Sequence, residues 1–315
     1  MESDISARGR TRRRLLLLTV LIGGGGLVAA VAAIGAAIGT LHHAPAAAGA
    51  LAIARIQFTY PMLNAAEGVL LVLALFGATA LTIAFRGGWR QLTAHRCFIN
   101  RLEVVGTLER RPHVKVIADP RPQAFCAGYL RPIVYVSQTT LQVLTDSELD
   151  AVLAHEHHHR LLRDPLRFAC GRILGRALFF VPVLRSLCDR YTDLAELSAD
   201  GAAVRASAGE QGPLAGALLR FAETSPPGAC GISPERVDAL LGHPSGWRLP
   251  WWLMAASVGS LSSLGLLVWR TSQVASAHVS LNLPLLSSRP CIVMSSLSLL
   301  GGGVLVGCGA RRRLG

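Results

Sequence analysis

The chain has 315 residues, of which only 16% are charged, whereas ordinary soluble domains carry about 25%. Its mean hydropathy of +0.43 excludes an ordinary soluble domain and predicts that much of the chain lies in lipid. The formal net charge of +12 is almost entirely arginine, since Lys115 is the only lysine. These arginines cluster beside apolar segments, without the interleaved aromatic residues of a nucleic-acid module. We therefore expect a lipid bilayer as partner and no direct nucleic-acid binding.

Four apolar segments approach or exceed the length that crosses a bilayer, which is about 20 residues. They are residues 15–39, 65–85, 249–269 and 291–310. The first is longer than the roughly 7–15 apolar residues of a signal peptide. We therefore predict that all four are retained transmembrane helices.

The arginines also predict an orientation, because positive residues mark the cytoplasmic side of membrane proteins. Residues 1–14 and 311–315 are arginine-rich, and so is the segment that follows the second span. By contrast, residues 40–64 hold only Arg55, and residues 271–288 hold no arginine. We predict a multi-pass protein of the cell membrane with cytoplasmic ends at 1–14 and 311–315. Its outer loops are 40–64 and 270–290, and residues 86–248 form one cytoplasmic domain.

Within residues 86–248, the pattern changes from strands to helices. Residues 114–118, 123–129 and 133–137 are rich in β-formers and predict three short strands. From residue 138 onward the apolar spacing is helical, and Thr145 with Glu148 forms a capping box before an apolar stripe. A helix at 189–205 and a short last helix at 233–241 follow. The predicted class is mainly α with a small β-sheet.

The helix after the capping box carries the H-E-x-x-H motif, at His155, Glu156 and His159. Positions four residues apart share one helix face, so the two imidazoles can bind one metal ion. Zn²⁺ in such a site polarises a scissile carbonyl and activates water. Glu156 is placed to act as the general base and then to protonate the leaving amine. The motif thus predicts a zinc metallopeptidase.

A catalytic zinc takes three protein ligands and keeps an open position. Glu196 and Asp200 form the only E-x-x-x-D in the chain and share a helix face. We expect Glu196 to be the third ligand and Asp200 to accept an imidazole N–H from outside the ligand set.

The two motifs between apolar segments resemble the integral-membrane gluzincins, which include heat-shock and CAAX-type membrane proteases and the BlaR/MecR-type antirepressor peptidases. The likeness is closer to the antirepressor group and covers about residues 120–207, including the stretches 124–132, 134–137, 149–156, 163–165 and 195–200. It implies a zincin-like domain with Zn²⁺ on His155, His159 and Glu196, Glu156 as base, and a substrate paired with a strand near 123–129. The penicillin-binding domain of the best-known members is missing, because Lys115 cannot supply its S-x-x-K motif.

Three functions fit these residues. The leading one is a zinc metalloendopeptidase that cleaves a cytoplasmic or membrane-proximal protein, with a winged-helix repressor as one candidate substrate. The second is a membrane-protein quality-control protease of the heat-shock type. The third is a non-catalytic metal-binding membrane sensor, which would use the same histidines without cleaving peptide bonds.

Overall fold

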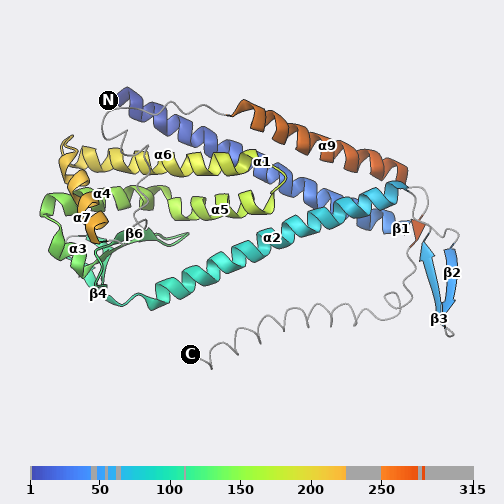
Figure 1. Cartoon of the computed structure of the whole chain (residues 1–315), viewed down its shortest axis with the longest axis horizontal. Helices are drawn as coiled ribbons and strands as arrows, with labels where there is room; N and C mark the ends of the chain where they lie inside the picture. The colour runs from blue at the N-terminus through green and yellow to red at the C-terminus, as the bar shows by residue number, and fades with distance from the viewer. Residues whose placement is uncertain are drawn as a thin grey trace. The chain divides into compact units, whose positions relative to one another are not determined.

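The computed structural model describes residues 2–43, 48–53, 56–61, 65–109, 111–224, 250–275 and 279–280. The chain divides into two compact units, the first made of residues 1–32 and 75–266, the second of residues 33–74 and 267–315. The structure confirms the mainly helical class with a small sheet (Figure 1).

Three helices among the described residues are long and apolar enough to cross a membrane. They are α1 (Glu2–Leu41), α2 (Ala65–Arg101) and α9 (Trp251–Ala275). The predicted fourth span, 291–310, and the predicted helix at 233–241 lie outside the described residues. Helix α2 continues well past residue 85, where the sequence predicted the span to end, because no proline interrupts it and its last turns pack Ile99 against the sheet.

The sheet of the first unit has four strands in the order β4-β5-β7-β6. These are β4 (Val104–Leu108), β5 (Arg111–Ile117), β6 (Ala124–Ala127) and β7 (Ile133–Ser137). Strands β5 and β7 are parallel, and each outer strand is antiparallel to its neighbour. Alternate residues of β5 and β7 point to one face, where they bury a cluster of valines with Leu153 of the next long helix.

Two strands differ from the prediction: β4 was not predicted, and β6 is shorter than predicted. The sequence predicted no strand at 104–108, because β4 is largely exposed and lacks a buried apolar face. Strand β6 is shorter than the predicted 123–129, since the chain turns at Gly128, whose φ of 114° suits a residue without a side chain.

Helices follow the sheet in chain order: α3 (Gln138–Val143), α4 (Asp146–Leu162), α5 (Asp164–Ala177), α6 (Val183–Ala206) and α7 (Gly212–Thr224). The predicted capping box at the start of α4 is present, with Thr145 and Glu148 each bonded to the other's backbone N–H. Helix α4 packs against α6, and α5 runs beside α6 (Figure 1). These contacts bring the faces of α4 and α6 that carry the two sequence motifs together.

Within the first unit, α1 packs on the turn between α5 and α6. Leu15 and Ile22 of α1 are buried with Leu178, Leu184 and Leu187 in one apolar cluster. Helix α9 adds Leu253, Met254 and Leu261 to the edge of this cluster. Two of the apolar helices, α1 and α9, therefore pack against α6, the helix that carries the second motif.

In the second unit, strands occupy the predicted outer loop 40–64. They are β1 (His42–His43), β2 (Ala48–Ile53) and β3 (Ile56–Pro61), and β1 pairs with β8 (Val279–Ser280). Strands β2 and β3 pair as an antiparallel hairpin. The helical ends in this unit bury Ala37, Leu70 and Ala74 together.

Gly77 allows α2 to approach α1 closely. A Cβ atom at Gly77 would lie 2.7 Å from the backbone oxygen of Ala30, which cannot move aside easily. We predict that Gly77→Ala lowers the free energy of unfolding by about 1–3 kcal/mol, measured as a lower Tm in detergent. Gly68→Ala on the same helix is the control, since among the described residues no atom beyond the adjoining helix backbone lies within 4 Å of its Cβ position. Equal Tm values for the two variants would refute this close approach.

Candidate metal centre

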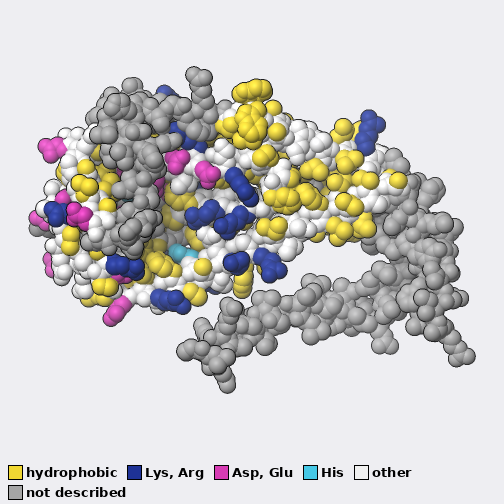
Figure 2. All heavy atoms as spheres, viewed as in Figure 1, with side chains coloured by type: hydrophobic (Ala, Val, Ile, Leu, Met, Phe, Trp, Pro, Cys, Tyr) yellow, Lys and Arg dark blue, Asp and Glu magenta, His cyan; other side chains and the backbone are white. Residues whose placement is uncertain are grey.

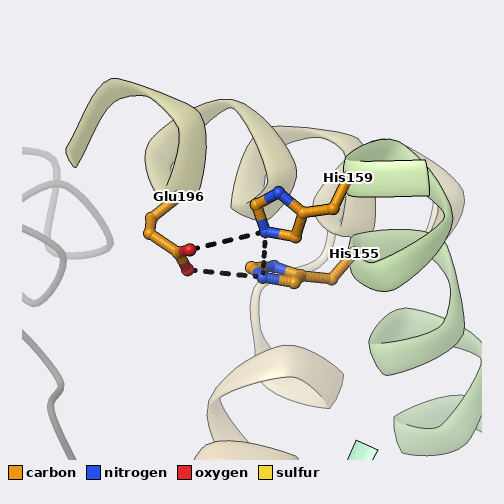
Figure 3. A group of neighbouring side chains, drawn as sticks. All are labelled: His155, His159 and Glu196. Carbon is orange, nitrogen blue, oxygen red and sulfur yellow. Dashed lines mark hydrogen bonds and ion pairs between the residues drawn. The ribbon is translucent and has the colours of Figure 1, made fainter. Parts of the chain in front are cut away.

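Helix α4 presents His155 and His159 one turn apart on its buried face. Their side chains are almost fully buried, with residue exposures of 8% and 6%. The two Nε2 atoms lie 3.2 Å apart (Figure 3). The sequence expected both imidazoles to face one point, and the helix places them so.

Glu196 reaches the same point from α6. Its Oε2 atom lies 3.5 Å from Nε2 of His155, and its Oε1 atom lies 3.5 Å from Nε2 of His159 (Figure 3). Two ligands of a tetrahedral ion bound at about 2.0–2.1 Å are roughly 3.3–3.4 Å apart. The observed distances between donor atoms, 3.2 and 3.5 Å, are therefore close to those between the ligands of one tetrahedral metal ion. These three side chains are the one such group among the residues that the structure describes.

A buried carboxylate lies behind each imidazole. Nδ1 of His159 is 2.9 Å from Asp164, and Nδ1 of His155 is 3.0 Å from Asp200. A carboxylate holds the ring proton on Nδ1, which leaves the Nε2 lone pair free for a metal. The structure thus places Asp200 beside His155. It also places Asp164 beside His159, a contact that the sequence analysis did not predict.

The charges around His155 favour a cation at this point. Burial alone would lower the pKa of His155, but the neighbouring Asp200, Glu196 and Glu156 outweigh it and raise the pKa to about 10. The same attraction that would hold a proton on the ring favours a divalent metal ion in its place. The donor set, two imidazoles and a carboxylate, is one that zinc accepts.

Glu156 lines the same cavity as the three candidate ligands. Desolvation raises the pKa of its carboxyl, partly opposed by His155 and His159. A carboxylate with a raised pKa takes up a proton more readily than one in water, which suits a general base.

Three other reactive side chains near the motif, His157, His158 and Cys126, are not among the candidate ligands. His157 is exposed, and His158 lies 3.4 Å from the Arg12 guanidinium, which together with burial lowers its pKa to about 4. Burial and the nearby Glu156 raise the pKa of Cys126 to about 12, so this thiol stays protonated and is a poor nucleophile.

Asp164 owes its place to the end of α4. Arg163 adopts a left-handed backbone conformation, with φ of 52°, and α5 begins at once with Asp164 and a proline. This sharp turn brings the Asp164 side chain back onto His159. Burial alone would raise the pKa of Asp164, but His159 and Arg12 outweigh it and lower the pKa, so the carboxylate is ionised.

Arg12, from the first apolar helix, is the charged partner of Asp164. Its side chain is buried and forms an ion pair with one carboxylate oxygen of Asp164. The hydroxyl of Tyr191 donates to the same oxygen at 3.2 Å and accepts from Arg12 at 3.1 Å. A continuous set of contacts thus joins α1 to His159, although the sequence analysis treated Arg12 only as a marker of the cytoplasmic side.

A cleft of about 1030 Å³ opens onto the candidate metal site. The walls include α2, α5 and strand β6, which is the edge strand of the sheet. An edge strand leaves backbone N–H and C=O groups for an added strand.

Loss of Arg12 should weaken metal binding. Arg12→Gln leaves the buried Asp164 carboxylate with only the more distant cation of Arg167, at 3.9 Å, among the described residues. His159 is then held less firmly, and we predict a zinc Kd about tenfold higher. The measurement is chelator competition on folded, purified protein. Arg12→Lys, which keeps the charge, should fall between Arg12→Gln and the parent protein. Arg13→Gln, at the exposed neighbouring position, is the control, and an equal Kd for Arg12→Gln and Arg13→Gln would contradict the role of Arg12.

Comparison with known families agrees with this geometry. Residues 88–211 match the model of peptidase family M48, and this range contains His155, Glu156, His159, Glu196 and Asp200. No curated protein matches the chain. The match confirms the expected metallopeptidase domain but does not single out the antirepressor group that the sequence resembles. The chain therefore contains a Peptidase M48 family domain, together with helices apolar enough to span a membrane.

Proposed function

We propose that the protein is a membrane-embedded zinc endopeptidase whose active site is the cluster of His155, His159 and Glu196 beside Glu156. The observation that carries this proposal is the spacing of the donor atoms: the two imidazole nitrogens lie 3.2 Å apart, and each lies 3.5 Å from one oxygen of Glu196, so that the three side chains can share one metal ion. A carboxylate with a raised pKa lies in the same cleft. These are the groups that metal-assisted hydrolysis of a peptide bond requires.

The residues divide the work as follows. Zinc, when bound, supplies the positive charge that polarises the scissile carbonyl and activates water. His155, His159 and Glu196 hold it, while Asp164 and Asp200 fix the two rings from behind. Glu156 accepts a proton from the attacking water and then delivers it to the departing amine.

The edge strand β6 offers a place for the substrate backbone. Residues 125–127 line the cleft, and within the described part of the chain β6 pairs with one strand only, β7. An extended segment that adds to β6 would lay its peptide bonds along the cleft beside Glu156. This arrangement suits an endopeptidase, since an added strand can continue in both directions.

The protein is proposed to lie in the cell membrane with its catalytic domain facing the cytoplasm, and its substrate to be a cytoplasmic protein or a protein segment near the bilayer. The arginine distribution supports this orientation. A repressor substrate and membrane-protein quality control both fit the site, and comparison of cellular proteomes with the active and the Glu156→Gln protein would separate them.

Glu156→Gln should separate metal binding from catalysis. The amide keeps the size of the side chain but cannot accept the proton, so we predict about one zinc per chain and a casein-cleavage rate lowered by about 10²–10⁴-fold. Zinc analysis and cleavage assays on the full chain in detergent measure both. The control is Asp150→Asn, an exposed position on the same helix with a solvent-exposed partner, Arg111. Undiminished cleavage by Glu156→Gln would show that Glu156 is not the base. If the parent protein cleaves no casein, either with or without chelator, the non-catalytic sensor is favoured.

The orientation can be tested at the turn between β6 and β7. A specific protease site inserted at Leu130 and Arg131, in that turn, should be cut in inside-out vesicles and protected in right-side-out vesicles. The opposite pattern would place the domain outside.

A further inference from the structure

Four arginines line the same cleft as the candidate metal site. Arg86 and Arg90 come from α2, and Arg172 and Arg176 come from α5. Figure 2 shows Lys and Arg side chains gathered along this hollowed side of the molecule. One cavity therefore joins a hydrolytic centre to a strongly basic wall.

The two pairs lie on facing walls. Each pair is spaced four residues apart, so both members share one helix face. Gly87 lies beside Arg86, Ile173 lies beside Arg172, and a Cβ at Gly87 would lie 3.9 Å from a side-chain carbon of Ile173. The two helices therefore meet beside the arginines, and all four arginines are among the residues that line the cleft.

Helix geometry places this basic region relative to the hydrolytic centre. The ring of Phe168 on α5 contacts that of His159, with centroids 6.2 Å apart. Arg172 and Arg176 follow Phe168 by one and two turns, which is about 6 and 12 Å along the helix. An extended substrate advances about 3.3 Å per residue, so the arginines would meet side chains roughly two to four residues from the cleaved bond.

These guanidinium groups have no acidic partner within the described part of the chain. Other arginines of the domain do have one, such as Arg220 with Glu148 and Arg111 with Asp150. The carboxylate of Glu196, which also lines the cleft, lies 3.5 Å from each of the two histidines. The unmatched positive charge lies where a substrate would pass.

We propose that this site selects protein segments with Asp or Glu about two to four residues from the cleaved bond. The proposal rests on the proposed peptidase function, because it assigns the substrate class of that site. The planar guanidinium fork matches a carboxylate in two-point contact. Anionic lipid headgroups carry similar charge, but these four arginines line the catalytic cleft, whereas Arg96 and Arg101 on the same helix do not.

Binding tests the subsite without requiring hydrolysis. The probes are two fluorescent peptide libraries of equal length, one with Asp and Glu at these positions and the other with Asn and Gln. We expect the full-length Glu156→Gln protein with zinc, in neutral detergent, to bind the acidic library about tenfold more tightly. The variant with all four arginines changed to Gln should bring the ratio of the two Kd values near one. The Arg96→Gln, Arg101→Gln control should keep the ratio.

Cleavage by the parent protein then separates the two proposals. If Glu156-dependent cleavage occurs with equal kcat/KM for both libraries and the acidic library binds no better, the subsite proposal is wrong and the peptidase stands. If acidic peptides bind through the four arginines but nothing is cleaved, the subsite stands and the peptidase proposal fails. Adding phosphatidylglycerol to phosphatidylcholine vesicles is a third arm, and loss of the acidic preference there would assign the arginines to lipid.

Discussion

The groups of the site are arranged around two imidazole nitrogens that lie 3.2 Å apart and a carboxylate that has one oxygen 3.5 Å from each nitrogen. Asp164 and Asp200 lie 2.9 and 3.0 Å from the Nδ1 atoms of the two rings, where a carboxylate favours a proton on Nδ1, and this tautomer directs both Nε2 lone pairs to one point. Lone pairs and a carboxylate repel one another unless a positive charge lies between them. The fold therefore creates a demand for a cation, and the donor types and their spacing match zinc.

Helices from distant parts of the chain supply the residues of this site. Helix α4 carries the two histidines, α6 carries Glu196 and Asp200, and the turn at Arg163 returns Asp164 to the back of His159. Arg12 of α1 neutralises Asp164 in a buried ion pair. Loss of this partner would leave a buried carboxylate poorly neutralised, at a large cost in free energy. The geometry of the candidate metal site therefore depends on the position of the first apolar helix. A movement of α1 would be transmitted to His159 through the side chains of Arg12 and Asp164.

Local patterns predicted the parts of this site that are close in sequence. The spacing of His155 and His159, the capping box at Thr145 and the run of β-formers in β7 each depend on neighbours within a few residues. The structure shows the capping box and β7 as predicted. Strand β4 and the strands at 42–61 were missed, and β4 at least has no buried apolar face to reveal it. The pairing of Arg12 with Asp164 joins residues 152 positions apart, so no local pattern indicates it. The basic wall of the cleft also arises only when α2 and α5 come together.

X-ray absorption at the zinc edge of the purified full-length protein tests the central claim most directly. The account predicts one zinc per chain with two imidazole nitrogens and oxygen ligands, at about 2.0–2.2 Å, and loss of one oxygen ligand or of the metal in Glu196→Gln. A sulfur ligand at about 2.3 Å, three or more imidazoles, or a spectrum that Glu196→Gln leaves unchanged would contradict it.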